Sequence, residues 1–96
     1  MKAVSIGAVV LDKKDNVGTA LRSIRSDDLV RLRLGKGMIS ITSIEAIPRG
    51  HKIALTDIRR GDLVIKYGEA IGKASVSIPK GSHVHIHNLR GRGINR

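Results

Sequence analysis

Short apolar runs, broken every few positions by Gly, Pro, Asn and Asp, constrain this chain more than any other feature of its sequence. The 96 residues include 11 glycines and one aromatic residue, Tyr67, so the core has to be built from Val, Ile, Leu and Ala. Short runs of β-branched residues between turn signals are typical of strands. They predict a single mainly β domain over residues 1–96, built as a small twisted barrel or clip of short strands.

The first half of the chain predicts one helix and one hairpin. Apolar residues between positions 17 and 24 follow the i, i+3, i+4, i+7 spacing of a short amphipathic helix. Asp15 and Asn16 are suitable caps for its N-terminus. Residues 29–34 and 38–44 each alternate apolar and polar side chains around a Gly-Lys-Gly turn, which predicts a hairpin with one wet face.

The second half contains an internal repeat at an offset of 31 residues. Ile47-Pro-Arg-Gly-His-Lys-Ile-Ala-Leu-Thr-Asp-Ile-Arg59 aligns with Ile78-Pro-Lys-Gly-Ser-His-Val-His-Ile-His-Asn-Leu-Arg90. Pro in the second place and Gly in the fourth are typical of a type I turn, and the alternation that follows predicts a strand. If the two copies pair within one sheet, the first brings His51 and Lys52 toward the histidines of the second. Residues 90–96 are predicted to be a mobile or docking tail.

Three of the four histidines occupy every second position from 83 to 87. On a strand, His83, His85 and His87 would share one face, with neighbouring side chains rooted about 6.8 Å apart. Neutral imidazoles are common metal ligands, and charged ones bind carboxylates. The alternative is a solvated strand face, because no carboxylate lies beside them in the sequence.

Polar residues near Gly68 form a second candidate group. Lys66 would supply an ammonium for a carboxylate, Tyr67 a phenol for proton transfer and Glu69 a carboxylate base. The alternative for each is an ordinary surface residue. Asn88 is suited to a turn cap whose side chain bonds nearby backbone.

The charge of the chain favours an anionic partner. Lys and Arg number 18 against 8 Asp and Glu, which leaves a net charge of +10. Nucleic acid, an acidic small molecule or an acidic protein surface would each fit, although the single tyrosine and the short helix argue against nucleic acid. The absence of Cys excludes disulfides and thiolate chemistry. The first residues lack the layout of a signal peptide or a membrane span, so we expect a soluble cytoplasmic protein.

A set of motifs resembles the small N-terminal domain of altronate and galactarate dehydratases. It is equally similar to the separate alpha subunits of that hydro-lyase family, which include those of sulfolactate sulfo-lyase. The matching blocks are Asp15-Asn16-Val-x-Thr-Ala-Leu21, Gly50-His-Lys-Ile-Ala-Leu55, Asp57-Ile-x-x-Gly61, Val64-Ile-Lys-Tyr-Gly-Glu69, Ile71-Gly72, Val84-His-Ile-His-Asn88 and Arg90-Gly-Arg-Gly93. Residues 22–46 show little resemblance.

The resemblance implies a β-clip fold of the SAF type and a role in a heteromeric lyase. The chain would act beside a large catalytic subunit that removes water or sulfite from a sugar acid or hydroxy acid, and it would be inactive alone. A divalent metal, iron or manganese, would be held mainly by that partner. The residue roles implied are metal ligands His85 and His87, substrate-binding His51, Lys52 and Asn88, and catalytic Lys66, Tyr67 and Glu69.

An alternative from another class is a non-catalytic basic β-clip module that binds nucleic acid or a protein surface. Such a module would show a steep salt dependence of binding. Whether the chain forms a homo-oligomer is left open at this stage.

Overall fold

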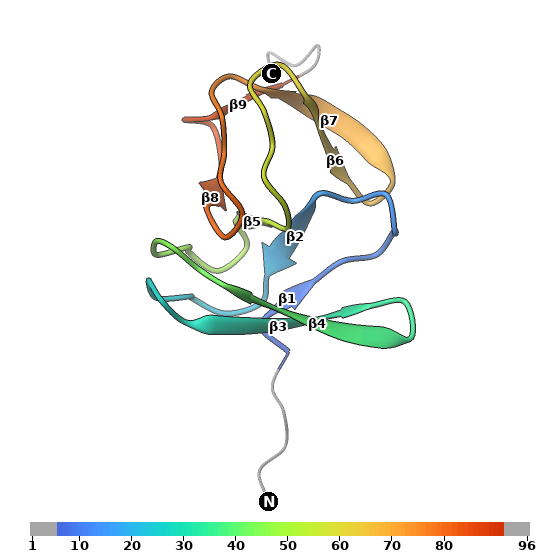
Figure 1. The fold of residues 1–96 in the computed structure, drawn as a ribbon, viewed down its shortest axis with the longest axis vertical. Helices are drawn as coiled ribbons and strands as arrows, with labels where there is room; N and C mark the ends of the chain where they lie inside the picture. Colours follow the sequence, from blue (N-terminus) through green and yellow to red (C-terminus); the bar gives the residue numbers. More distant parts are fainter. Residues whose placement is uncertain (1–5, 92–96) are drawn as a thin grey trace, which may run out of the picture.

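The computed structural model describes residues 6–91, which form nine strands in two sheets (Figure 1). The strands are β1 (Ala8–Val9), β2 (Val17–Ala20), β3 (Leu29–Leu34), β4 (Gly37–Thr42), β5 (Lys52–Ala54), β6 (Leu63–Lys66), β7 (Glu69–Ala74), β8 (His83–Val84) and β9 (Leu89–Gly91). Six strands pair in the order β4-β3-β1-β2-β5-β8 and three in the order β6-β7-β9. The mainly β prediction is confirmed, whereas the barrel is wrong, because both sheets are open.

The predicted helix is also wrong: among residues 6–91 there is no helix, and β2 occupies the first half of the expected span. β2 is paired on both sides, with β1 and with β5, and both pairings are antiparallel. A helix of two turns forms few internal hydrogen bonds, so two strand ladders outweigh it. Gly18 favours this outcome, because it lowers helix propensity and lets the carbonyl oxygen of Val9 approach to 3.3 Å from where a Cβ would stand.

Asp15 and Asn16 connect the start of the chain to the β6–β7 hairpin instead of capping a helix. The Asn16 side chain donates to the carbonyl oxygen of Leu63 at 2.9 Å and accepts from the backbone N–H of Ile65 at 2.7 Å. Oδ1 of Asp15 accepts from the backbone N–H of Gly68 at 2.8 Å. These bonds attach the second hairpin to the segment before β2.

The predicted hairpin of the first half is confirmed. β3 and β4 pair in continuous register from Leu29 opposite Thr42 to Leu34 opposite Gly37. Side chains alternate along β3, so that Val30 and Leu32 are buried while the two arginines between and after them are exposed. The wet face therefore lies where the alternation indicates.

A five-residue corner occurs four times, at residues 24–28, 47–51, 58–62 and 78–82. Each begins with a buried isoleucine, and the backbone N–H of its fifth residue donates to the carbonyl oxygen of its second at 2.9 to 3.1 Å. The fourth residue is left-handed, with φ of 72° at Asp27, 85° at Gly50, 91° at Gly61 and 87° at Gly81. A positive φ in the third place of the turn defines type II, so the predicted type I turn is wrong. Proline occurs in two of the four turns, as Pro48 and Pro79, and there it stands first, not second.

The corners pair in twos and divide the chain into two similar halves. Ile24 bridges Ile47, and Ile58 bridges Ile78. The order strand, corner, hairpin, corner, strand runs from β2 to β5 and again from β5 to β8. The internal repeat is thus wider than the sequence alignment suggests, and β5 belongs to both copies.

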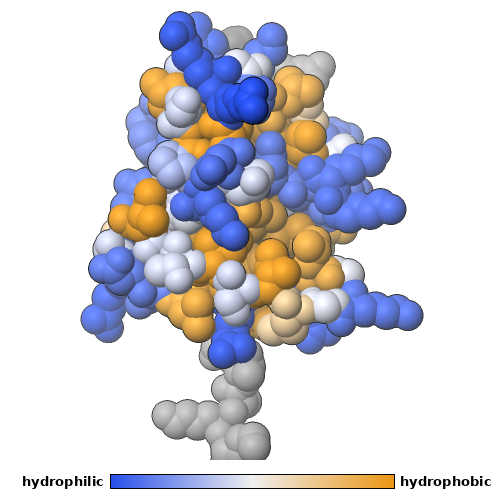
Figure 2. Space-filling model, viewed as in Figure 1, coloured by the Kyte–Doolittle hydropathy of each residue, from blue (hydrophilic) through white to orange (hydrophobic). Residues whose placement is uncertain are grey.

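The hydrophobic core follows the same division. The first cluster contains Ala8, Val10, Ala20, Ile24, Val30, Leu32, Ile41, Ile47 and Ile53. The second contains Val17, Ala54, Ile58, Val64, Ala74, Ile78 and Val84. Some large apolar side chains remain exposed, and Figure 2 shows apolar patches between charged side chains on one face.

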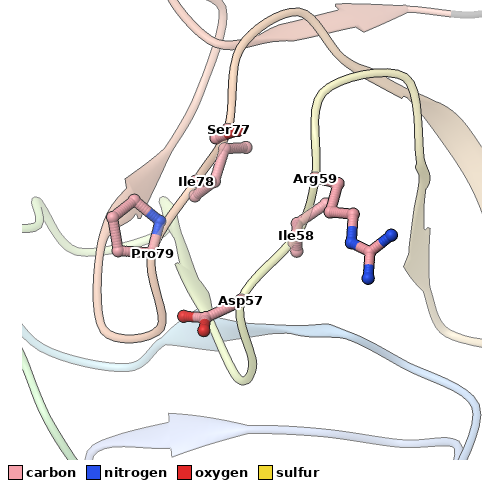
Figure 3. Close-up of a pocket in the computed structure, with 6 residues that line it drawn as sticks. All are labelled: Asp57, Ile58, Arg59, Ser77, Ile78 and Pro79. Atoms are coloured by element: carbon pink, nitrogen blue, oxygen red, sulfur yellow. The ribbon is translucent and has the colours of Figure 1, made fainter.

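A hollow of about 380 Å³ opens over the second pair of corners (Figure 3). Ile58 and Ile78 face one another there, with Pro79 and Asp57 at one end of the hollow. Oδ1 of Asp57 already accepts from the backbone N–H of Lys80 at 2.8 Å. The hollow therefore holds no converging set of reactive groups.

Residues 90 and 91 of the predicted tail belong to β9, which pairs with β7. The remainder, residues 92–96, lies outside the described residues. Within the described part of the chain, no helix is long and apolar enough to cross a membrane.

Two left-handed glycines provide a matched test of the corners. Gly50→Ala is expected to lower the free energy of unfolding by about 1 kcal/mol, because only the backbone conformation is strained and no atom lies within 4 Å of the added Cβ. Gly81→Ala should cost clearly more, because its Cβ would overlap the carbonyl oxygen of Thr42. Urea denaturation measures both, and equal losses would show that this close approach does not matter.

Candidate functional site

Three histidines converge at the edge of the six-stranded sheet and form what we call the imidazole cluster: His51, His83 and His85. One ring nitrogen from each lies within 4.8 Å of the others. Nδ1 of His51 is 2.8 Å from Nε2 of His83, and the rings of His51 and His85 stack with centroids 3.9 Å apart. All three side chains are half-buried, so the cluster is open on one side.

The pairing of β5 with β8 assembles the cluster. Lys52 lies opposite Val84 and Ile53 opposite His83, in an antiparallel ladder. This register brings His51, the residue before β5, to the level of His85. The two sequence copies do pair within one sheet, so the condition under which His51 would approach the other histidines is met.

A turn directly after β8 removes His87 from the cluster. β8 ends at Val84, so the predicted strand face carrying His83, His85 and His87 is wrong. Asn88 is buried and closes the turn, because its Oδ1 accepts from the His85 N–H and its Nδ2 donates to the His83 carbonyl oxygen, each at 2.9 Å. His87 is exposed, with its ring 5.0 Å from that of His83 and tilted by 43°.

Burial favours the neutral form of two imidazoles of the cluster, those of His83 and His85. Burial lowers the pKa of His85, and repulsion from His51, Lys52 and His87 lowers it further. Burial also lowers the pKa of His83, with repulsion from the other imidazoles partly offset by Glu45. Neutral imidazole is the form that binds metals. Nδ1 of His85 is buried and has no hydrogen-bond partner among the described residues.

Glu45 is a carboxylate that the sequence analysis missed. Its Oε2 accepts from the backbone N–H of His83 at 2.9 Å, across 38 residues of sequence. The neighbouring bond from the Ile44 N–H to the Gly81 carbonyl oxygen, 3.0 Å long, holds this segment against the corner before β8. No local signal in the sequence indicates this contact, because it depends on long-range pairing.

Lys52, Lys66 and Tyr67 form a second polar group, which includes three of the predicted site residues. Lys52 lies opposite Thr19 in the β2–β5 ladder, and the Tyr67 hydroxyl donates to Oγ1 of Thr19 at 3.4 Å. Nζ of Lys66 lies 4.9 Å from the centre of the Tyr67 ring. Glu69 is exposed and pairs with Lys66 in the β6–β7 ladder.

Electrostatics link this group to the imidazole cluster. Burial lowers the pKa of Lys52, and repulsion from Lys66 lowers it further. Lys52 in turn contributes to the lowered pKa of His85. Tyr67 also has a φ of 55°, a left-handed conformation that is costly for a residue with a large side chain. Strain of this kind gathers at functional sites.

The chain belongs to the family of the altronate/galactarate dehydratase SAF domain, whose family model matches residues 6–92. Among individual proteins, it is similar to the altronate dehydratases of Bacillus subtilis (strain 168) and Escherichia coli (strain K12), at 43% identity over 82 and 76 residues. These matches cover 85% and 79% of this chain but only 16% and 14% of the two relatives. The resemblance seen in the motifs is confirmed.

A third relative is matched along almost its whole length. It is the (2R)-sulfolactate sulfo-lyase subunit alpha of Chromohalobacter salexigens, at 35% identity over 92 residues. The match covers 91% of this chain and 96% of that subunit. In that relative, a separate chain of about this size bears the name of a lyase subunit.

Acid is expected to destabilise the metal-free chain below the ordinary histidine pKa of 6.5. His83 and His85 have lowered pKa values in the folded state, so the unfolded chain binds more protons in this range and is favoured as the pH falls. The stability they contribute is complete above pH 6.5 and is lost as the pH falls toward their folded pKa values. Urea denaturation with a chelator, at several pH values across this range, measures the loss.

His85→Gln should flatten this pH dependence, and His87→Gln, which replaces an exposed ring, is the matched control. The same flattening in both variants would contradict the assignment of the effect to the buried rings.

Proposed function

We propose that the chain is the small subunit or small domain of a lyase that removes water or sulfite from a hydroxy acid or sugar acid. The observation that carries the proposal is the imidazole cluster, a set of three ring nitrogens that lie within 4.8 Å of one another and are open on one side. Its residues lie within the part of the chain that matches the family model. Similarity along 96% of a sulfo-lyase alpha subunit supports the same function.

The imidazole cluster would hold a divalent metal ion, iron or manganese. Its chemistry fits such an ion, because three nitrogen donors approach one another and Nδ1 of His85 is buried without a partner among the described residues. When bound, a divalent metal supplies a Lewis acid that polarises an oxygen of the substrate. Histidine is a common ligand for these metals, and three protein ligands leave positions open for substrate and partner. His87, beside the cluster, stays a predicted ligand that only mutation can test.

Lys52 and Lys66 would attract and orient the carboxylate of the acid. Both are half-buried, and repulsion from Lys66 lowers the pKa of Lys52, so an anion beside Lys52 would be favoured. The lowered pKa also makes Lys52 a better proton acceptor near neutral pH than an exposed lysine. Elimination needs a base for the proton next to the carboxylate, and Lys52 is the strongest candidate on this chain.

Tyr67 would stand beside this carboxylate as a proton donor for the departing group. Its hydroxyl is already oriented by Thr19, and its backbone is held in a strained conformation. Glu69 remains a predicted base at the exposed end of the same hairpin. Asn88 acts as a positioning residue, because it is buried and fixes the backbone of both His83 and His85.

A large subunit would complete the site from its open side. In the two altronate dehydratases the matched segment is 16% and 14% of the chain, so most of each protein lies outside it. We infer that the partner of this chain corresponds to that remaining part. The charge of +10 suits both an anionic substrate and an acidic partner surface.

Metal-binding measurements distinguish the imidazole cluster from the predicted strand face as the source of the metal ligands. His85→Ala is expected to weaken binding of Mn(II) by about tenfold or more, because it removes a ligand. His87→Ala, outside the cluster, should change it by less than about threefold. Titration followed by electron paramagnetic resonance measures both, and a larger loss in His87→Ala would restore the strand-face hypothesis.

Activity should require a second chain. The purified protein alone is expected to show no turnover of altronate, galactarate or sulfolactate. Mixed with a large dehydratase subunit, it is expected to turn over one of these acids. In that mixture His85→Ala should lower kcat by about 100-fold or more. Lys36→Ala, at the exposed β3–β4 turn, is the control and should leave kcat unchanged. Full activity of the chain alone, or of His85→Ala in the mixture, would refute the proposed function.

A further inference from the structure

A basic pocket lies where β7 pairs with β9, at the end of the molecule away from the β3–β4 hairpin (Figure 1). Its volume is about 240 Å³. The residues that line it are Arg60, Gly61, Lys73, Ala74, Ser75 and Arg90. Hydrophilic side chains gather at the same end of the molecule in Figure 2. Three cationic side chains therefore surround one small hollow.

Two of these cations stand face to face. Lys73 lies directly opposite Arg90 in the antiparallel β7–β9 ladder. Side chains in such a pair have Cβ atoms about 4.5 to 5.5 Å apart, and like charges there destabilise the sheet. The β7–β9 ladder holds the two strands together here, and Gly72 packs against the Arg90 carbonyl so closely that a Cβ would overlap it.

No acidic side chain of the described residues neutralises the pocket. Among residues 6–91, the side chains of Arg22 and Asp28 form an ion pair at 3.3 Å. No ion pair in this part of the chain involves the three cations of the pocket. Asp62 follows the pocket residue Gly61, but its Oδ2 accepts from the Arg59 N–H at 3.1 Å within the corner turn. None of the three cations therefore has an ion-pair partner among residues 6–91.

We propose that the basic pocket binds a small dianion of the phosphate type. Two guanidinium groups present paired N–H donors that match oxyanions, and the lysine adds a compact positive charge. The Ser75 hydroxyl, in the wall of the pocket, is a further donor. A volume of about 240 Å³ is below the range of drug-sized ligands, which favours a small ion over a nucleotide.

Recognition would come from side chains alone. The backbone N–H groups of Gly61, Ala74 and Ser75 already donate to the carbonyl oxygens of Ala74, Asp62 and Asn88 at 2.8 to 3.0 Å. The pocket is therefore rigid at its base and adaptable at its charged rim. Because none of its residues belongs to the imidazole cluster, this site does not depend on the proposed function.

Titration of the whole chain with inorganic phosphate, at constant ionic strength set by chloride, tests the proposal. Two-dimensional amide NMR should show saturable shifts at Lys73, Ser75 and Arg90. Lys73→Gln and Arg90→Gln should each weaken binding by about fivefold or more. Arg31→Gln removes the same charge from the exposed face of β3 and should leave binding unchanged.

Thermal unfolding gives a second readout. Phosphate should raise the Tm of the natural chain and have little effect on Arg90→Gln, because ligands stabilise the state they bind. Without phosphate and at low salt, Arg90→Gln should itself raise the Tm, because it removes the like-charge pair. Shifts that do not saturate, equal responses in Arg31→Gln and Arg90→Gln, or saturation by an acidic peptide but not by phosphate would each overturn the proposal.

Discussion

Reciprocal backbone hydrogen bonds at the four corners hold the strands of this protein in place. At the second corner the N–H of Gly50 donates to the Ala20 carbonyl oxygen, and the Ala20 N–H donates to that of His51. The same two bonds join Gly81 and Ser82 to Ala54 at the fourth corner. They require a left-handed residue, because only that conformation turns the chain while its N–H still faces the neighbouring strand. Asp27 fills this place in the first corner.

The position of the imidazole cluster follows from these corners. His51 comes directly after left-handed Gly50, and His83 comes two residues after left-handed Gly81. The two halves thus bring their histidines together from positions that differ by one residue in the repeat. The second half then departs from the first, because the Asn88 turn folds His85 back over His51. The cluster arises where an otherwise regular repeat is broken.

The sequence predicted those features that depend on local pattern or on direct similarity between segments. The β3–β4 hairpin followed from alternation, and the repeated segments raised the pairing of β5 with β8 as a possibility. The helix at residues 17–24 failed because a strand followed by a corner buries Ala20 and Ile24 equally well, at a spacing that resembles a helix. His87 was grouped with the cluster because alternation does not show where a strand ends.

Contacts between distant segments were beyond local reasoning. Glu45 reaches His83 only because the segment after β4 packs against the corner before β8. Lys73 and Arg90 appear in the sequence as two of many scattered cations, and only the β7–β9 register places them opposite one another. Predicting either contact requires the register of strands that are far apart along the chain.

The strand β5 has only three residues, yet it is the last strand of one half and the first of the other. Its Ile53 packs in the first core cluster and its Ala54 in the second. A protein built in this way has no boundary at which the two halves separate. Neither half could be excised as an independent miniature domain, since the two halves share β5, which would lose either β2 or β8 as a pairing partner. The duplication that is visible in the backbone therefore yields one cooperative folding unit instead of two modules in series.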